Sequence, residues 1–347
     1  MSMRLEMLQV ARLAPQLLGE STGLVAGFLQ RQQNDDGGFK DRTGKSDLYY
    51  TVFGLDGLLA LQIDPRLDRV AGYLQPFGEG EGLDFVHLCC LARCRGAVHH
   101  GTAGLRLPDS ELSQLRAPVA PPSLGSHPSP CPLPSVGGER VYGTSRRSAK
   151  EAETQVRGES PARILRRIEI FRSADGGYHP VAGSPHGTVY AAFLALGAYQ
   201  DLKGDLPEPA RLVESLKSLE TGDGAWSNEP EARTGSTTAT AAAATLLRHL
   251  HVPIDPSAGE WLLARCHRDG GFLAAPRAPM PDLLSTATAL HALAGMQRSF
   301  GHVKQPCLDF IDTLWTNEGA FHGQWADDHL DCEYTYYGLL ALGHLSL

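Results

Sequence analysis

Apolar residues along the chain recur in pairs of stretches with helical spacing, and each pair is separated by a short glycine-containing turn. In the stretch 212–219, Leu212, Val213, Leu216 and Leu219 return every three or four positions between polar residues. Val189, Phe193 and Leu196 repeat this spacing in an earlier stretch. Because the spacing places apolar side chains on one face of a helix, the chain is predicted to consist of helical pairs.

The turn between the two stretches has a recurring signature of an acidic residue, one or two glycines and an aromatic residue. It occurs at Asp36-Gly37-Gly38-Phe39, Asp175-Gly176-Gly177-Tyr178, Asp223-Gly224-Ala225-Trp226, Asp269-Gly270-Gly271-Phe272 and Glu318-Gly319-Ala320-Phe321. The last four turns follow one another at intervals of 48, 46 and 49 residues, and 139 residues separate Gly37 from Gly176. That long interval has room for one degenerate unit, at Gly80 to Gly96, and an insertion. The period therefore predicts six units.

Each turn carries signals for the end of one helix and the start of the next. Glycine suits a left-handed cap at the end of the first helix, and the aromatic residue is expected to fold back onto that helix. The second helices are predicted to begin after capping residues, which accept hydrogen bonds from free backbone N–H groups. These caps are Ser46-Asp47, Gly235-Ser236, Asp282 and Asp331.

The periodic pattern is interrupted between the second and third units. Residues 102–160 are rich in Pro, Ser, Gly and Arg, and cannot bury enough apolar surface to offset the entropy of ordering them. Repeats 1–2 are therefore assigned to residues 1–101, a disordered insertion to 102–160, and repeats 3–6 to 161–347. The insertion has seven basic and six acidic residues, which favours an inert spacer over a binding motif.

Composition narrows the partners and the compartment. The 347 residues carry a formal net charge of -8, which argues against a nucleic-acid-binding surface. No apolar run approaches the length of about 20 residues that a membrane span needs, and residues 1–18 do not resemble a signal peptide. Seven scattered cysteines indicate free thiols in a reducing compartment. We therefore expect a cytoplasmic protein without a membrane span.

The turns and the closing run from Asp331 to Gly343, Asp-Cys-Glu-Tyr-Thr-Tyr-Tyr-Gly-Leu-Leu-Ala-Leu-Gly, resemble the prenyltransferase and squalene-cyclase repeat. Six units are most similar to the β subunit of protein prenyltransferases, especially the Rab geranylgeranyltransferase type. The resemblance implies an all-α fold, an α/α toroid of six inner and about six outer helices around a cavity that holds an isoprenoid chain. It also implies a farnesyl or geranylgeranyl diphosphate ligand, a cysteine-containing protein acceptor and an α-subunit-like partner.

The zinc site that this resemblance implies is altered here. The family holds zinc with an Asp-x-Cys motif at the fifth inner helix and a histidine at the sixth. Asp282 matches, but Leu284 occupies the cysteine position and Tyr334 the histidine position. No zinc is therefore expected unless the site has been rebuilt from Asp282, His329 and Cys332, beside Glu333. Asp282 and Asp331 are equally explained as helix caps, and Cys332 as a small buried residue.

A second group of potential metal ligands lies in an apolar stretch of the degenerate unit. His87, Cys90 and Cys94 share one face of the predicted helix. Core packing is the favoured explanation for this group.

Arginines take the positions of the family's diphosphate-binding residues. Arg265 matches the family's arginine, Arg233 replaces a histidine, and Arg277 lies two residues from Pro279, which replaces a lysine. Ser285 replaces the tyrosine that contacts the diphosphate. Guanidinium groups form strong paired hydrogen bonds to phosphate oxygens, so the sequence is compatible with an anion pocket. Three solvated surface arginines are an equally good interpretation.

Aromatic residues are expected to line the inner ring. Such side chains suit an isoprenoid or a developing carbocation. The predicted lining consists of Tyr49, Tyr50, Phe53, Tyr190, Phe193, Tyr334, Tyr336 and Tyr337. The Thr and Ala residues of 237–245 indicate a thin wall beside a wide pocket or, slightly favoured, close helix packing.

Two functions are compatible with the sequence. The chain lacks the Asp-x-Asp-Asp acid of squalene-type cyclases, so we do not expect a cyclase of that kind. One hypothesis is a protein prenyltransferase β-subunit-like protein that binds an isoprenyl diphosphate, with or without transfer to a cysteine. The alternative is a non-catalytic toroid that binds a lipid or a protein partner.

Overall fold

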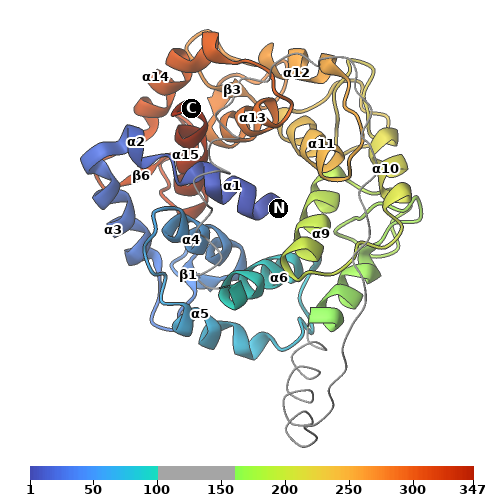
Figure 1. The fold of residues 1–347 in the computed structure, drawn as a ribbon, viewed down its shortest axis with the longest axis horizontal. Coiled ribbons are helices and arrows are strands. Elements are labelled where there is room, and N and C mark those ends of the chain that lie inside the picture. The colour runs from blue at the N-terminus through green and yellow to red at the C-terminus, as the bar shows by residue number, and fades with distance from the viewer. Residues whose placement is uncertain (101–160) are drawn as a thin grey trace, which may run out of the picture.

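In the computed structural model, which describes residues 1–100 and 161–347, the helices form two concentric rings (Figure 1). The predicted insertion at 102–160 lies outside the described residues. The inner ring consists of α4 (Leu48–Ala60), α6 (Phe85–His100), α9 (Val189–Asp201), α11 (Thr237–His249), α13 (Leu283–Gly295) and α15 (Cys332–Leu345). The outer ring consists of α3 (Thr22–Gln32), α5 (Leu67–Leu74), the helical residues 161–168, α10 (Pro209–Ser218), α12 (Pro256–Leu263) and α14 (Lys304–Leu314). This arrangement confirms the predicted α/α toroid.

The inner ring closes on itself. Each inner helix contacts the next, and α15 contacts α4, so the last repeat packs against the first. The inner helices run in the same direction, as contacts between α4 and α15 illustrate. Tyr49 contacts Glu333 at the amino-terminal ends of these two helices, and Phe53 contacts Tyr337 one turn further along both. All amino-terminal ends of the inner helices therefore lie at one mouth of the toroid.

The acidic-glycine turns join outer to inner helices through tight four-residue turns. Gly37, Gly176, Gly224, Gly270 and Gly319 all have positive φ, as expected from the sequence. Their position differs from the expectation, because the glycine follows the helix end by several residues instead of capping it. In the first turn α3 ends at Gln32, and Gly37 N–H donates to the Asn34 carbonyl at 3.0 Å. The glycine is required by the turn itself.

The aromatic residue of each turn packs against the following inner helix. Trp226 also contacts the preceding helix, as the sequence suggested, because its Nε1–H donates to the Leu216 carbonyl of α10 at 3.0 Å. Phe39 is fully buried, and a side chain at Gly54 of α4 would overlap its ring. Phe39 N–H also donates to Thr51 Oγ1 of α4 at 3.0 Å. Trp226 with Thr240 and Phe272 with Thr286 repeat this hydrogen bond at 3.1 and 2.9 Å. The aromatic residue therefore fixes where each inner helix begins relative to its turn.

Short hairpins border three of the turns, and a few short helices connect the rest. The antiparallel pairs are β1 (Phe39–Lys40) with β2 (Ser46–Asp47), β3 (Phe272–Leu273) with β4 (Pro281–Asp282), and β5 (Trp315–Thr316) with β6 (Ala320–Phe321). The short helices are α2 (Pro15–Leu18), η1 (Gly19–Ser21), η2 (Gln75–Phe77), η4 (Glu169–Phe171) and η5 (Gly301–Val303). The degenerate second unit has its turn at Gly80, which also has positive φ, but Gly96 lies inside α6.

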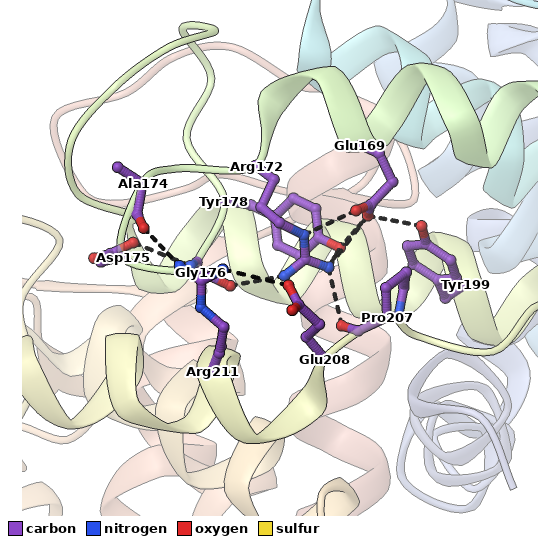
Figure 2. Close-up of polar contacts among 11 residues, drawn as sticks. Glu169, Arg172, Ala174, Asp175, Gly176, Tyr178, Tyr199, Pro207, Glu208 and Arg211 are labelled. Carbon is purple, nitrogen blue, oxygen red and sulfur yellow. Dashed lines mark hydrogen bonds and ion pairs between the residues drawn. The ribbon is translucent and has the colours of Figure 1, made fainter.

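The third turn shows how polar contacts hold a repeat together (Figure 2). Arg172 donates to Glu169 at 2.8 Å, to the Gly176 carbonyl at 2.8 Å and to the Tyr178 hydroxyl at 2.6 Å. Tyr199 of α9 donates its hydroxyl proton to Glu169 Oε1 at 2.7 Å. The network thus joins η4, the turn and the inner helix.

The predicted caps of the inner helices are confirmed. Asp47 Oδ1 accepts from the amide of Tyr49 at 2.8 Å, and Ser236 Oγ accepts from Ala239 at 3.3 Å. Asp282 accepts from Ser285 at 2.7 Å and Asp331 from Tyr334 at 2.9 Å. These caps satisfy backbone donors at the mouth of the toroid.

Helix α1 (Met3–Ala11) stands outside the repeat and lies across the centre of the ring (Figure 1). It contacts α4, α9 and α15. Its partners, including Asp56, Gln200 and Gly343, lie in the carboxyl-terminal parts of the inner helices. Helix α1 therefore occupies the end of the toroid opposite the mouth.

Candidate functional site

Aromatic side chains from α4 and α15 gather inside the ring below the mouth. The ring centroids of Tyr49 and Phe53 are 5.0 Å apart, and those of Phe53 and Tyr337 are 5.5 Å apart. The Tyr50 ring lies 5.6 Å from that of Tyr49. Tyr336, which the sequence analysis placed in the lining, is fully buried with its ring 6.0 Å from Phe53. These edge-on and tilted contacts form one continuous aromatic surface.

A cavity of about 50 Å³ extends from this aromatic surface to helix α1. Its walls come from α1, α4, α6 and α9. They are lined by Met3, Arg4, Met7, Tyr49, Val52, Phe53, Cys89, Cys90, Arg93, Phe193, Leu194, Gly197, Ala198 and Asp201. Helix α11 contributes none of these described lining residues, and four of its five alanines are buried against neighbouring helices. The small residues of 237–245 therefore serve close packing.

The floor of the cavity carries buried charges. Asp56, which is 1% exposed, accepts from Arg4 Nε at 2.8 Å and from Arg93 Nη2 at 2.8 Å. These two guanidinium groups hold the pKa of Asp56 below its ordinary value, although burial alone would raise it. Burial raises the pKa of Asp201, which also lines the floor, to about 6. The cavity thus has aromatic walls near the mouth and, at its floor, charged side chains held in place by ion pairs.

A partly buried carboxyl group, that of Glu333, lies beside the aromatic surface near the mouth. Glu333 Oε1 accepts a hydrogen bond of 2.6 Å from the Tyr49 hydroxyl. Burial raises the pKa of Glu333 to about 7, and the neighbouring Asp331 adds to this rise while the Tyr49 hydrogen bond opposes it. Near neutral pH the group is therefore partly protonated and can exchange a proton.

Arg42, from the loop between β1 and β2, covers the start of α15. It donates to Asp331 at 3.0 Å and to Asp327 at 3.3 Å, and its guanidinium carbon lies 5.7 Å from the centre of the Tyr334 ring. On α6, which neighbours α4, His87 lies 2.8 Å from Asp84 and 3.1 Å from Asp47. Side-chain contacts thus connect repeats one, two and six around the mouth.

The known proteins that this chain resembles share this architecture. The model of the prenyltransferase alpha-alpha toroid domain matches residues 13–90, 159–272 and 255–346. This chain belongs to that family. No curated protein sequence matches it.

Solved structures with the toroid fold cover nearly the whole chain at low identity. A type II terpene cyclase from Scytonema, in complex with geranylgeranyl dihydroxybenzoate, is 14% identical, with a TM-score of 0.55 over 96% of this chain and 97% of the cyclase. A protein from Actinoplanes is 14% identical, with a TM-score of 0.54 over 94% of this chain and 98% of its own. Protein geranylgeranyltransferase-I from Candida albicans, complexed with GGPP, is 16% identical, and the match covers 54% of this chain and 62% of that one with a TM-score of 0.43. The two whole-chain matches show a common fold.

The positions expected to hold zinc in the toroid family do not fit that ion here. Asp282 is a helix cap that also accepts from the Ser285 hydroxyl at 2.8 Å. Cys332 is 0% exposed, and burial raises the pKa of its thiol well above the ordinary value, whereas zinc binds the thiolate. His329 is exposed and lies 2.9 Å from Asp327. Within residues 1–100 and 161–347, no group of three or more potential ligand side chains is arranged to hold a metal ion.

His87, Cys90 and Cys94 do share a helix, as expected, but they serve different contacts. Cys90 and Cys94 are buried, and burial raises the pKa of both thiols. His87 contacts the carboxylates of Asp47 and Asp84. These environments agree with core packing for the two cysteines.

The three arginines expected at the diphosphate position occupy different surroundings. Arg265 follows α12, and its guanidinium carbon lies 4.6 Å from the centre of the Trp261 ring. Its Nε atom is buried and has no hydrogen-bond partner among the described residues. Arg233 and Arg277 are exposed in loops of the rim. Of the three, Arg265 is the one with an unused buried donor.

Inner-helix starts and rim loops of successive repeats are joined by hydrogen bonds. The Thr237 amide donates to the Ala274 carbonyl at 2.9 Å, and Leu283 donates to the Gly323 carbonyl at 2.8 Å. Tyr190, which is 39% exposed, donates its amide proton to Asn228 Oδ1 at 2.9 Å. The loops carrying Arg233 and Arg277 are therefore fixed at both ends to an ordered rim.

Two parts of this site were not foreseen from the sequence. The Glu333–Tyr49 pair joins residues 284 positions apart, and Arg4 reaches Asp56 from a helix outside the repeat. The sequence pattern places Glu333 only beside the positions of a rebuilt zinc site. The one available signal was an acidic residue among apolar and aromatic residues at the start of a predicted inner helix.

Glu333 should make folding stability depend on pH. Its pKa is raised from 4.5 to about 7, so the folded state holds this proton more tightly than the unfolded state does. The free energy of unfolding should therefore fall as pH rises through this window. Thermal unfolding of the parent and Glu333→Gln between these pH values tests this, because glutamine removes the titration and Asp201 still titrates in both proteins. Identical pH profiles would show that Glu333 keeps an ordinary pKa.

Proposed function

We propose that this chain binds the end of an isoprenoid against the aromatic surface inside the toroid, and that it does not transfer the chain through a zinc-bound thiolate. The observation that carries the proposal is the cavity lined by Tyr49, Phe53 and Phe193, which extends from near the mouth to helix α1. Aromatic faces and edges suit the branched, unsaturated units of an isoprenoid.

The remaining cavity wall supports an apolar ligand. Cys89 and Cys90 line it, and burial raises the pKa of both thiols, that of Cys90 to about 12. They are therefore neutral and contribute apolar, polarizable surface. The Scytonema cyclase, which has the same fold, binds a geranylgeranyl compound, and this agrees with the proposed ligand class.

The unused donor of Arg265 supports a second part of the proposal, namely that the ligand carries an anionic head group. Its guanidinium stacks on Trp261 and keeps a buried Nε–H without a protein acceptor among the described residues. A diphosphate oxygen is a suitable acceptor for such a donor. Arg233 and Arg277, on the neighbouring rim loops, are proposed to add charge around the same group.

Zinc-dependent transfer to a cysteine is not part of the proposal, because the donor set does not suit the ion. Leu284 and Tyr334 stand where the family has ligands, and Asp282 is committed to capping α13. The non-catalytic hypothesis from the sequence is therefore the better supported one. A protein partner at the mouth is compatible with it.

Binding of isoprenyl compounds tests the proposal directly. We expect geraniol or farnesol to bind the parent, and the matching diphosphate to bind more tightly. Phe193→Ala should weaken binding of the alcohol by about ten-fold, because a well-packed ring contributes about 1.4 kcal/mol through contact and burial. Isothermal titration calorimetry measures these affinities.

The control variants separate the two parts of the proposal. Phe77→Ala removes a half-buried ring of η2 outside the cavity and should leave the affinity unchanged. Arg265→Ala should remove the advantage of the diphosphate over the alcohol and leave alcohol binding intact. If neither compound binds the parent, the isoprenoid proposal fails. If diphosphate and alcohol bind equally well, only the head-group site fails.

A further inference from the structure

Helix α1 forms the floor of the cavity described above. It contributes Met3, Arg4 and Met7 to the lining, on the side opposite the mouth. Met3 is 2% exposed and Met7 is 7% exposed, so both side chains are inside the ring. The floor is therefore built by a segment that is separate from the six repeats.

The position of this floor is fixed by contacts of the first half of the helix. Ser2 caps the helix through the Leu5 amide, and the Met3 amide donates to Gln200 Oε1 of α9 at 2.8 Å. Arg4 pairs with Asp56 of α4, as described above. Further along, Glu6 lies 3.0 Å from His249 Nε2 of α11. Helix α1 is thus tied to three inner helices.

A second charged contact strengthens this attachment. Glu6 also pairs with Arg248, and His291 of α13 lies 3.6 Å from it. Although burial alone would raise the pKa of Glu6, the hydrogen bonds and charges of these neighbours lower it to about 2. The carboxylate therefore stays charged and paired at neutral pH, and the floor does not open by titration of Glu6 there.

The space above this floor is short for an isoprenoid. The cavity of about 50 Å³ is well below the volume of about 150 Å³ that holds a benzene molecule. Pockets for whole small-molecule ligands usually start at about 300 Å³. Only the terminal part of a chain can therefore enter while Met3 and Met7 fill the end.

We infer that helix α1 determines the length of isoprenoid that this toroid accepts, with Met3 and Met7 as the specificity-determining residues that favour short chains. This inference rests on the proposed function. Both methionine side chains occupy space at the end of the cavity. Replacement of either by alanine removes the outer part of a flexible, unbranched side chain and makes the cavity deeper. The longest chains gain most from the added depth.

The wall opposite Met3 supports this role. Gly197 of α9 lines the same cavity, and a β-carbon at this position would lie 3.7 Å from the Met3 methyl carbon. This is ordinary van der Waals contact, so alanine fits at Gly197 without moving the helix. The glycine therefore leaves space at the bottom of the cavity that an alanine would fill.

The test compares a series of chain lengths in parent and variant proteins. Affinities for geraniol, farnesol and geranylgeraniol are measured by calorimetry for the full chain, for Met3→Ala and for Met7→Ala. The parent should bind geraniol most tightly. Each variant should shift the preference toward the longer alcohols by about ten-fold, measured as the ratio of geranylgeraniol to geraniol affinity.

Two further variants make the result decisive. Leu8→Ala removes a fully buried side chain from the same helix outside the cavity, so it should lower the melting temperature without changing the length preference. Gly197→Ala adds a methyl group that makes the cavity smaller, so it should shift the preference further toward geraniol. This variant decides the question if the methionine variants fail to fold. A length preference that is the same in parent, methionine and Gly197→Ala proteins would overturn the inference. Failure of all three alcohols to bind the parent would instead refute the proposed function.

Discussion

Replacement of Asp56 by alanine should lower the free energy of unfolding by about 3–5 kcal/mol. Asp56 is the single carboxylate that accepts hydrogen bonds from both Arg4 and Arg93 among the described residues, and it is 1% exposed. Its removal leaves two guanidinium groups buried without this partner, while Asp201 has a pKa raised to about 6 and compensates only in part. Urea unfolding followed by circular dichroism measures the loss.

A matched surface variant calibrates this effect. Glu214→Ala removes an exposed carboxylate that pairs with Lys217 on α10, and it should change the free energy of unfolding by less than about 0.5 kcal/mol. The double variant Asp56→Ala/Arg4→Met should recover part of the loss, because it removes one of the uncompensated charges. If Asp56→Ala proves as stable as Glu214→Ala, the buried charges do not hold helix α1 in place.

Replacement of Gly270 by alanine should cost about 2–5 kcal/mol, through backbone strain and overlap together. Gly270 has a φ of +87°, and a β-carbon there would lie 1.8 Å from the Pro306 carbonyl oxygen in α14. The overlap involves backbone and cannot be relieved by rotation of a side chain. Thermal and denaturant unfolding of the variant measure the loss.

Gly222 provides the control for this prediction, since it lies in the corresponding turn of the preceding repeat. A β-carbon at Gly222 meets no atom within 4 Å, and its φ does not lie in the left-handed region. Gly222→Ala should therefore leave the free energy of unfolding nearly unchanged. Equal stability of the two alanine variants would show that α14 moves freely away from the turn.

The toroid was predictable because its elements are specified locally and repeatedly. Each turn supplies a glycine with positive φ, each following helix begins at a cap, and these signals recur at nearly constant intervals. Two expectations at this level differ from the structure: the turn glycine follows the helix end and does not cap it, and the turn aromatic packs against the next helix. Sequence order suggested the preceding helix, but Gly54 offers Phe39 a flat surface on the next one. Such a choice depends on shape after folding and is not visible in a local pattern.

The site was less predictable because its contacts cross the ring. Eight aromatic residues were expected to line the inner ring. Tyr49, Phe53 and Phe193 do line the cavity, whereas the other five, Tyr50, Tyr190, Tyr334, Tyr336 and Tyr337, are not among its lining residues. Arg265 keeps a buried N–H donor without an acceptor because Trp261 covers its guanidinium group. The spacing of residues in the sequence does not reveal this burial. The pKa of Glu333 likewise depends on burial beside a tyrosine from the opposite end of the chain.

The position of helix α1 affects the order in which its contacts can form while the chain is being synthesised. Helix α1 is made before the six repeats, yet it packs against α15 of the sixth repeat, where a β-carbon at Gly343 would overlap the Val10 carbonyl. Contacts between such distant segments form late, because the loop that they close includes the repeats between them. The part of α1 that faces α15 must therefore stay unpaired, and a potential target for chaperones, until the sixth repeat has emerged, although α4 of the first repeat can pack against the helix earlier.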